Sequence, residues 1–275
     1  MSEPALSPEV APKYARLRGI VRGAGGMVVG YSGGVDSSLL LKVATMELKE
    51  RAVGVIGVSP SLAPEELAEA RETARAMGAR YREVDAHELE VEDYARNPVN
   101  RCYWCKGEIL GKLLAVAEEE GLPVVADGYN SEDAGDHRPG QQAARERGVA
   151  SPLAEAGFTK ADIRELARAL GVPSWDKPAR PCLASRIAYG VRITRDLLER
   201  VGEAERKVRA AVPRAREVRV RHLADGSARV EVEPAAVDQA TAARELIVRE
   251  LAALGYEKVE VDPKGYRRGA LLERP

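Results

Sequence analysis

The stretch that most constrains the fold of this chain is VVGYSGGVDSSLLLKV, at residues 28–43. An apolar run ends at Tyr31, a turn of Ser32, Gly33 and Gly34 follows, and an amphipathic helix comes next. Glycines at such a turn let backbone N–H groups approach an oxyanion without an obstructing Cβ, and the helix directs the positive end of its dipole at the same point. The stretch therefore predicts a strand–turn–helix unit that cradles phosphate at the edge of an α/β sheet.

The polar groups of this turn distinguish it from the common nucleotide-binding loop. The spacing is not GxxxxGK[ST], so a kinase-like or GTPase-like grip on phosphates is not indicated. Asp36 would repel a bare polyanion, and a metal ion between its carboxylate and the phosphates would relieve that repulsion. The alternative is a strand-to-helix turn that is merely rich in small residues. We expect a phosphate group to bind at Ser32, Gly33, Gly34, Asp36, Ser37 and Ser38.

Short apolar strands alternate with helices over residues 1–175. This alternation is typical of βαβ units and of a parallel sheet covered by helices on both faces. We predict an α/β domain over this range, in which ligands bind beyond the carboxyl ends of the strands. The expected strands are 27–31, 52–58, 80–85 and 123–128, and the expected helices are 11–23, 37–49, 63–78 and 102–120.

The pattern changes after residue 175. Residues 176–194 contain prolines and glycines without a clean period, which is typical of a linker or an active-site loop. Residues 195–275 predict a small α+β domain of αββαβ order, which binds substrate or mediates oligomerisation. Its expected elements are a helix at 195–212, a hairpin of strands at 217–223 and 227–234, a helix at 236–254 and a strand at 258–262.

Composition narrows the functional classes. The chain has 275 residues, of which 45% are hydrophobic and 31% charged, as in an ordinary globular protein. Its net charge of −1 lacks the basic excess expected of a nucleic-acid-binding protein. No apolar stretch approaches the roughly 20 residues that span a bilayer, and the N-terminus has no secretory signal pattern. We expect a cytoplasmic homo-oligomer that acts on a small molecule, with no membrane or nucleic-acid partner.

Three cysteines are too few for a disulfide framework, and their number is odd. Cys102 and Cys105 form a C-x-x-C pair at an expected helix N-terminus, a pattern shared by redox pairs, zinc ligands and cluster ligands. Cys182 lies in a proline-bounded loop with Arg180 and Arg186 nearby, and positive neighbours favour the nucleophilic thiolate. The alternative for Cys182 is a buried packing residue.

Four stretches together carry a resemblance to a known family. YSGGVDSSLL resembles the pyrophosphatase loop of the PP-loop ATP α-hydrolase superfamily, in which the loop holds pyrophosphate as the leaving group. RCYWCK, ADGYNSEDAGDHRPG and KPARPCLASRIAYG narrow the match. With the αββαβ tail, they make nearly the whole chain resemble the LarE family of ATP-dependent sulfur transferases, which act in nickel-pincer nucleotide biosynthesis.

The resemblance implies a substrate and a sulfur source. The substrate would be pyridinium-3,5-biscarboxylic acid mononucleotide, whose carboxylate is adenylated and then converted to a thiocarboxylate. In one version of the family a single cysteine, here Cys182, loses its sulfur and becomes dehydroalanine. In the other, three cysteines hold a [4Fe–4S] cluster that carries an extra sulfide. The presence of Cys102, Cys105 and Cys182 favours the cluster version.

Further residues are assigned to the nucleotide, to metal or to substrate. The resemblance implies that Ser59, just past the second strand, contacts the nucleotide, and Gly128 lies past the fourth strand at the same carboxyl edge of the sheet. Candidate Mg²⁺ ligands are Asp133 and Asp136, and candidate substrate residues are Trp104, Arg138, Arg186, Glu205, Arg219 and Arg221. Arg219 and Arg221 alternate along a strand and so face one side, where they would clamp a phosphate.

Plainer assignments and rival functions stay open. Ser59 would otherwise be a loop serine, the aspartates turn residues, Trp104 a core aromatic, and the two arginines a solvated sheet face. Residues 266–268 are expected in a solvated tail. The rival functions are an ammonia-using adenylating synthetase, a tRNA thiolase, which would need a basic groove, and an ATP-binding regulator.

Overall fold

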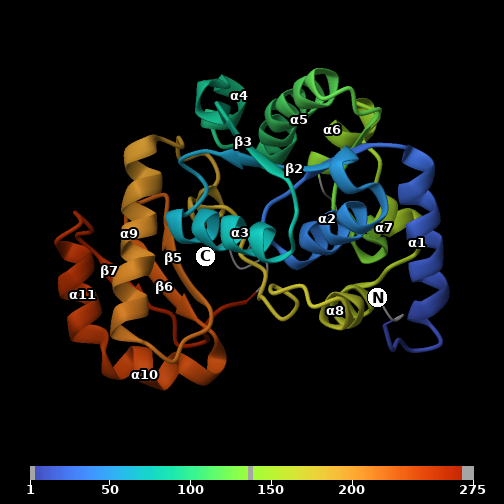
Figure 1. Cartoon of the computed structure of the whole chain (residues 1–275). Helices are drawn as coiled ribbons and strands as arrows, with labels where there is room; N and C mark the ends of the chain where they lie inside the picture. The colour runs from blue at the N-terminus through green and yellow to red at the C-terminus, as the bar shows by residue number, and fades with distance from the viewer. Residues whose placement is uncertain (1–3, 136–138, 268–275) are drawn as a thin grey trace. The chain divides into compact units, whose positions relative to one another are not determined.

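The computed structural model describes residues 4–135 and 139–267, which form two compact units (Figure 1). Among the described residues, the first unit comprises 4–59, 64–91, 100–135 and 139–179, and the second comprises 60–63, 92–99 and 180–267. The chain therefore passes between the units several times, and each unit contains segments that are far apart in sequence. The roles predicted for the two domains stay predictions.

The first unit is built on a parallel sheet of four strands in the order β3-β2-β1-β4. The strands are β1 (Met27–Gly30), β2 (Ala52–Val58), β3 (Tyr81–Asp85) and β4 (Val124–Ala126). In register, Val28 of β1 lies between Val53 of β2 and Val125 of β4. The two central strands are apolar on both faces, as expected for a sheet covered on both sides.

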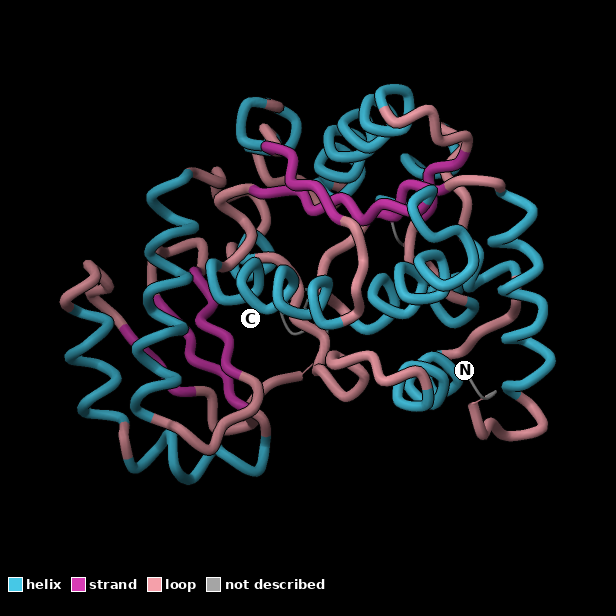
Figure 2. Tube along the Cα trace, viewed as in Figure 1, coloured by secondary structure: helices cyan, strands magenta, loops and turns pink. Residues whose placement is uncertain are grey.

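Helices cover both faces of this sheet, so the predicted α/β fold is confirmed (Figure 2). On one face, apolar residues of α5 pack with those of β1 and β2, and α6 lies beside α5. On the other face lie α2 and α3 (Figure 1). The helices are α1 (Val10–Ala24), α2 (Val35–Leu48), α3 (Pro64–Ala76), α5 (Arg101–Glu119), α6 (Pro139–Glu146), α7 (Pro152–Glu155) and α8 (Lys160–Ala169).

Helix α2 begins two residues earlier than the sequence predicts. Gly34 is its N-cap and has an extended backbone, with φ −74° and ψ 159°. Val35 and Asp36 therefore belong to the first turn of the helix rather than to the loop before it. The glycine turn is correspondingly short, and the free N–H groups of the helix start directly beyond it.

The second unit is a small α+β fold with a sheet in the order β5-β6-β7. Strands β5 (Val218–His222) and β6 (Ala228–Val232) form the predicted hairpin, and β7 (Val259–Val261) lies parallel to β6. The helices are α4 (Glu92–Ala95), α9 (Arg195–Ala211), α10 (Val237–Ala242) and α11 (Arg244–Ala252). Val208 of α9, Ile247 of α11 and the valines of the hairpin share its core.

One predicted helix of this unit is in fact interrupted. The helix expected over 236–254 is two helices, α10 and α11, which meet at Ala243. The backbone there has φ −88° and ψ 7°, outside the helical region, so the helix axis changes direction. The hydrophobic period persists across the break because both pieces pack on the same core.

Residues 180–194 pack within the second unit. The amide of Leu183 donates to the Ser61 carbonyl (2.8 Å), and the Ile193 amide donates to the Ala95 carbonyl (2.8 Å). The fully buried Asn97 donates from Nδ2 to the carbonyls of Ala188 (2.8 Å) and Val191 (3.0 Å). The segment around Cys182 is thus held by backbone and side-chain hydrogen bonds.

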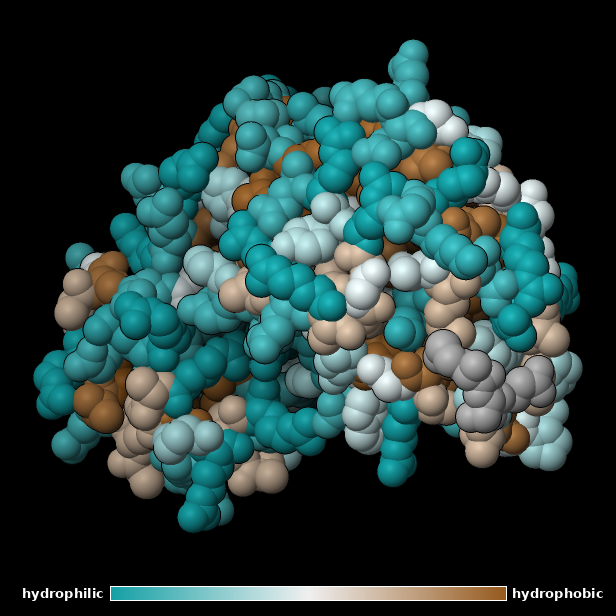
Figure 3. Space-filling view, viewed as in Figure 1, coloured by the Kyte–Doolittle hydropathy of each residue, from teal (hydrophilic) through white to brown (hydrophobic). Residues whose placement is uncertain are grey.

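The viewed face of the chain is largely hydrophilic, with scattered apolar groups (Figure 3). Among the described residues, the exposed large apolar side chains are Val99, Leu114, Trp175 and Leu246. No helix in the described ranges is both long and apolar enough to cross a membrane.

Candidate active site

The glycine turn after β1 has a shape that only glycine permits. Gly33 has φ +72°, and a Cβ there would lie 2.7 Å from the Cβ of Ala70. The Ser37 hydroxyl donates to the Gly34 carbonyl (3.2 Å) and accepts from the Ser32 amide (3.2 Å), and the two serine hydroxyls are 3.2 Å apart. These bonds curl the loop beneath the N-terminus of α2, where an anion is favoured.

Other residues predicted to contact the nucleotide follow the neighbouring strands. Gly128 comes shortly after β4, and a Cβ on it would lie 2.8 Å from the Ser37 amide nitrogen. Ser59 is half-buried directly after β2. Ser38 is fully buried in α2, and its amide donates to the Gly34 carbonyl (3.0 Å). Gly128 is thus brought against the loop, while the nucleotide roles of these residues stay predictions.

An acidic cluster lies beside the loop. Asn130 donates from Nδ2 to Asp133 Oδ2 (2.6 Å) and to Asp36 Oδ2 (3.3 Å), and Lys160 forms an ion pair with the same Asp36 oxygen. Burial raises the pKa of Asp36, the Lys160 ammonium opposes that shift, and the nearby Asp133 carboxylate adds to it. The cluster therefore places two carboxylates and one cation close to the candidate phosphate site.

The acidic cluster fits a magnesium ion. Asp36 Oδ1 is buried and has no hydrogen-bond partner among the described residues, so this carboxylate oxygen could serve as a ligand to a cation. Mg²⁺ prefers oxygen ligands and is commonly bound by one or two carboxylates together with substrate phosphates. Asp36 and Asp133 would hold the ion. The predicted residues Asp136 and Arg138 lie outside the described residues.

Lys160 was not anticipated from the sequence. It is the first residue of α8, 124 residues from Asp36, after a capping box made by Thr159 and Asp162. The spacing T-x-x-D marks the start of that helix. The capping box does not indicate which carboxylate Lys160 contacts, because Lys160 and Asp36 become neighbours only when the chain folds.

Two of the three cysteines share the start of α5. Cys102 is exposed and Cys105 is half-buried, and both lie in the first two turns of the helix, as predicted. Trp104 between them is half-buried and packs edge-to-face with Tyr103, at 5.1 Å between ring centroids. Stacking of Trp104 on a substrate ring stays a prediction.

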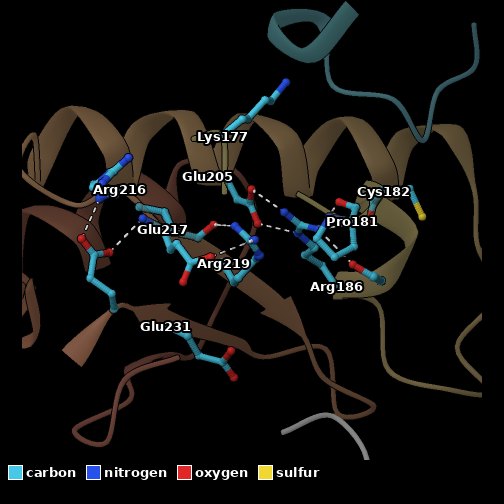
Figure 4. A network of polar contacts seen from close by, with 12 residues as sticks. Lys177, Pro181, Cys182, Arg186, Glu205, Arg216, Glu217, Arg219 and Glu231 are labelled. Carbon is cyan, nitrogen blue, oxygen red and sulfur yellow. Dashed lines mark hydrogen bonds and ion pairs between the residues drawn. The ribbon is translucent and has the colours of Figure 1, made fainter. Parts of the chain in front are cut away.

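Cys182 belongs to the second unit and is exposed, so the alternative of a buried packing residue is wrong. Its carbonyl accepts from the Ser185 amide (2.9 Å) and from Arg186 Nη1 (3.1 Å). Arg186 Nη1 also donates to the Pro181 carbonyl. In Figure 4 the sulfur of Cys182 points away from Arg186, which leaves the thiol open to a reaction partner.

Arg186 and Glu205 form a buried ion pair behind Cys182 (Figure 4). Arg186 Nε and Nη2 lie 2.7 and 3.2 Å from the Glu205 carboxylate oxygens, and Glu205 Oε1 also accepts from the Val220 amide (3.2 Å). The guanidinium is thus engaged with a carboxylate and with the carbonyls of Pro181 and Cys182. This arrangement gives both residues a structural function, and their contact with substrate stays a prediction.

Arg219 and Arg221 face one side of β5, as the alternation predicts. Their guanidinium carbons lie 5.2 and 5.8 Å from the centroid of the Tyr266 ring. Arg221 Nε is 2.9 Å from Glu231 Oε2, and burial, together with the nearby Arg186, lowers the pKa of Arg219. Both arginines are buried, so the alternative of a solvated sheet face is wrong. Tyr266 packs on them rather than lying in a solvated tail, and Arg268 is outside the described residues.

The iron–sulfur cluster stays a prediction. No group of three or more histidine, cysteine, aspartate or glutamate side chains that would hold a metal ion occurs within residues 4–135 and 139–267. Cys102 and Cys105 lie in the first unit and Cys182 in the second. The structure therefore unites two of the three proposed cluster ligands on one helix.

The sheet and the loop fit an ATP-using enzyme of the PP-loop class, and the matches to known proteins show that the chain is one. The profile of the NAD synthase family matches residues 15–96, which include β1, the loop and β2. The chain is 32% identical over 264 residues to the pyridinium-3,5-bisthiocarboxylic acid mononucleotide synthase of Lactiplantibacillus plantarum, a match that covers 95% of this chain and 94% of that protein. The chain belongs to the LarE family of PP-loop sulfur transferases.

Two other relatives span similar lengths. An uncharacterised protein of Synechocystis is 43% identical over 246 residues, covering 89% of this chain and 91% of that protein. An uncharacterised protein of Methanocaldococcus jannaschii is 28% identical over 241 residues, covering 88% and 90%. The match in each case extends well beyond the loop and includes both units.

Proposed function

We propose that this chain adenylates a carboxylate of pyridinium-3,5-biscarboxylic acid mononucleotide with ATP and replaces the adenylate by sulfur, giving a thiocarboxylate. The observation that carries the proposal is the 32% identity to the Lactiplantibacillus plantarum synthase over 95% of this chain. Support comes from the geometry of the loop and from Cys182, which is exposed at the end of a well-anchored segment. The product would serve nickel-pincer nucleotide biosynthesis.

The first step separates pyrophosphate from ATP. The substrate carboxylate oxygen attacks the α-phosphorus, and the bond from that phosphorus to the bridging oxygen of pyrophosphate breaks. The N–H groups at the start of α2 and the Lys160 ammonium stabilise the charge on the departing pyrophosphate. Asp36 and Asp133 would hold Mg²⁺, which supplies further positive charge to the phosphates.

The second step transfers sulfur. The Cys182 thiolate attacks the acyl carbon, AMP leaves, and a thioester joins the protein to the substrate. A base then removes the Cα proton of Cys182, the Cβ–S bond breaks, and thiocarboxylate departs from a dehydroalanine residue, with no oxidant required. The other source is sulfide on a [4Fe–4S] cluster held by Cys102, Cys105 and Cys182, which would supply a replaceable sulfur at an open iron position.

Anaerobic purification with iron and sulfide analysis, followed by mass spectrometry after turnover, tests both sources. A loss of about 34 Da at Cys182, the mass of H₂S, supports the sacrificed cysteine, and stoichiometric iron with unchanged Cys182 supports the cluster. Cys182→Ser should abolish thiocarboxylate formation and retain pyrophosphate release that depends on the carboxylate substrate. Pyrophosphate release without that substrate, or thiocarboxylate formation by Cys182→Ser, would contradict the proposal.

A further inference from the structure

Asp127 is a buried carboxylate at the carboxyl end of β4 that the proposed reaction does not use. Its Oδ1 accepts from the Ser151 hydroxyl (2.9 Å) and the Tyr129 amide (3.2 Å). Its Oδ2 accepts from Gln141 Nε2 (3.2 Å) and forms an ion pair with Lys106 Nζ (3.2 Å). Four donors from four different segments therefore converge on one side chain.

On one side, Asp127 holds the backbone that supports the phosphate loop. Its amide donates to the Ala150 carbonyl (2.9 Å), and the next residue is Gly128. A Cβ on Gly128 would lie 2.8 Å from the Ser37 nitrogen and 3.1 Å from the Ser37 Cα. The backbone after Asp127 is thus in close contact with the first turn of α2. A shift of Asp127 would therefore displace Gly128, which packs against the residues that follow the phosphate loop.

On the other side, Asp127 holds the start of α5. Lys106 directly follows Cys105 and lies four residues after Cys102, so it shares a helix face with Cys102. A Cβ on Gly140 of α6 would lie 3.3 Å from the Cys102 carbonyl oxygen and 3.4 Å from the Lys106 Cβ. The bonds of Lys106 and Gln141 to Asp127 therefore anchor the cysteine turn and the adjoining end of α6 at one point.

We propose that Asp127 is a positioning residue that holds two active-site segments in place: the phosphate loop through Gly128, and the Cys-x-x-Cys turn through Lys106. The inference rests on the proposed function in one respect: the proposed function assigns the phosphate loop and the Cys-x-x-Cys turn to the same reaction. The positioning itself follows from contacts within the first unit. A side chain that served stability alone would affect both segments no more than the rest of its unit.

Three variants separate the two connections. Asp127→Asn keeps the size of the side chain and removes its charge, so both segments should loosen. Lys106→Met should loosen only the cysteine turn, and Gly128→Ala should disturb only the loop. Lys112→Met is the matched control, because Lys112 lies on the same helix and its ammonium is 4.0 Å from the Glu108 carboxylate rather than close to Asp127.

Hydrogen–deuterium exchange of the free full-length protein is the first measurement. In Asp127→Asn, amide exchange should rise about fivefold or more in peptides covering 31–38 and 101–106, and remain unchanged in β2. In Lys106→Met, exchange should rise only in the peptide covering 101–106. In Gly128→Ala it should rise only in the peptide covering 31–38, and in Lys112→Met it should rise in neither. Pyrophosphate release gives the second readout: Asp127→Asn and Gly128→Ala should raise the KM for ATP about threefold or more, and Lys106→Met should not.

Equal exchange in Asp127→Asn and the wild type, or a uniform rise across the first unit, would overturn the inference. The same conclusion follows if Lys106→Met changes the loop as much as the cysteine turn. If Asp127→Asn does not fold, the opposite patterns of Lys106→Met and Gly128→Ala decide the question. A failed sulfur-transfer assay with the predicted exchange pattern would contradict the proposed function and leave the positioning role standing.

Discussion

Asp36 has opposing influences on its protonation. Burial raises the pKa of Asp36 and the Lys160 ammonium lowers it, but the effect of burial is larger, so the net shift is upward. The folded protein therefore binds this proton more tightly than the unfolded chain, so the free energy of unfolding falls as the pH rises through the Asp36 pKa. The ionised form is nevertheless the one that binds a cation, so metal binding and stability have opposite pH dependences at this residue.

We expect Mn²⁺, as a paramagnetic substitute for Mg²⁺, to bind more tightly as the pH rises through the Asp36 pKa. Lys160→Met removes the cation that lowers this pKa, so the midpoint of the profile should move to higher pH. Electron paramagnetic resonance titrations with Mn²⁺ and ATP measure the midpoint. Lys13→Met is the control, because it breaks a 2.6 Å ion pair with Asp162 of the same helix, α8. An identical midpoint in Lys160→Met and the wild type would contradict this assignment.

Glu205 is the second residue with a measurable individual effect. Glu205→Gln leaves the buried Arg186 guanidinium without its carboxylate, so we expect a loss of about 3–5 kcal/mol in the free energy of unfolding. Glu203→Gln breaks the exposed Arg206–Glu203 pair on the same helix and should cost less than about 1 kcal/mol. Urea denaturation compares the two variants. Equal losses would mean that the buried pair contributes no more than a surface pair.

At the scale of single elements, the start of α2 is determined by the glycine turn. Gly34 adopts an extended backbone and ends the loop, so the helix begins at once and presents its N–H groups to the candidate phosphate site. Gly33 permits this because its positive φ and its contact with Ala70 both exclude a side chain. The short loop is thus a consequence of local backbone geometry and of packing against α3.

Gly33→Ala should lower ATP-dependent pyrophosphate release about tenfold or more, because the new Cβ would force the loop away from Ala70. Gly78→Ala is the matched control. Gly78 also has a positive φ, +65°, but a Cβ added to it would meet no atom of the described residues within 4 Å, its chain neighbours aside. This change should therefore cost about 1 kcal/mol of stability and leave activity intact. Steady-state kinetics with thermal unfolding of both variants separates the loop effect from a general loss of stability. Equal activity in the two variants would show that the loop tolerates displacement.

The elements also show how far the sequence predicts the fold. All four strands of the first sheet are predicted close to their observed ends, because apolar runs between helices of βαβ units leave few other assignments. The break between α10 and α11 escapes prediction because both helices continue one hydrophobic stripe onto one core. The burial of Arg219 and Arg221 escapes it too, because alternation indicates a shared face and does not indicate what covers that face.

At the scale of the whole molecule, each unit carries a different part of the proposed chemistry. The phosphate loop, the acidic cluster and the Cys-x-x-Cys turn lie in the first unit. Cys182, the Arg186–Glu205 pair and the arginines of β5 lie in the second. Several chain crossings join the units, so segments far apart in sequence, such as 92–99 and 180–194, fold together in the second unit.

The sequence by itself determined the local features of this protein: the strand–turn–helix unit, the order of the elements, and the residue types available for phosphate, metal and sulfur chemistry. These depend on near-neighbour backbone geometry and hydrophobic period, which a linear pattern records. Only the tertiary structure decided that Lys160 reaches Asp36, that Arg186 is paired with Glu205, and that Asp127 joins four segments. Those contacts depend on which strand ends and helix faces become neighbours after folding, and residues far apart in the chain leave no local pattern for such a pairing.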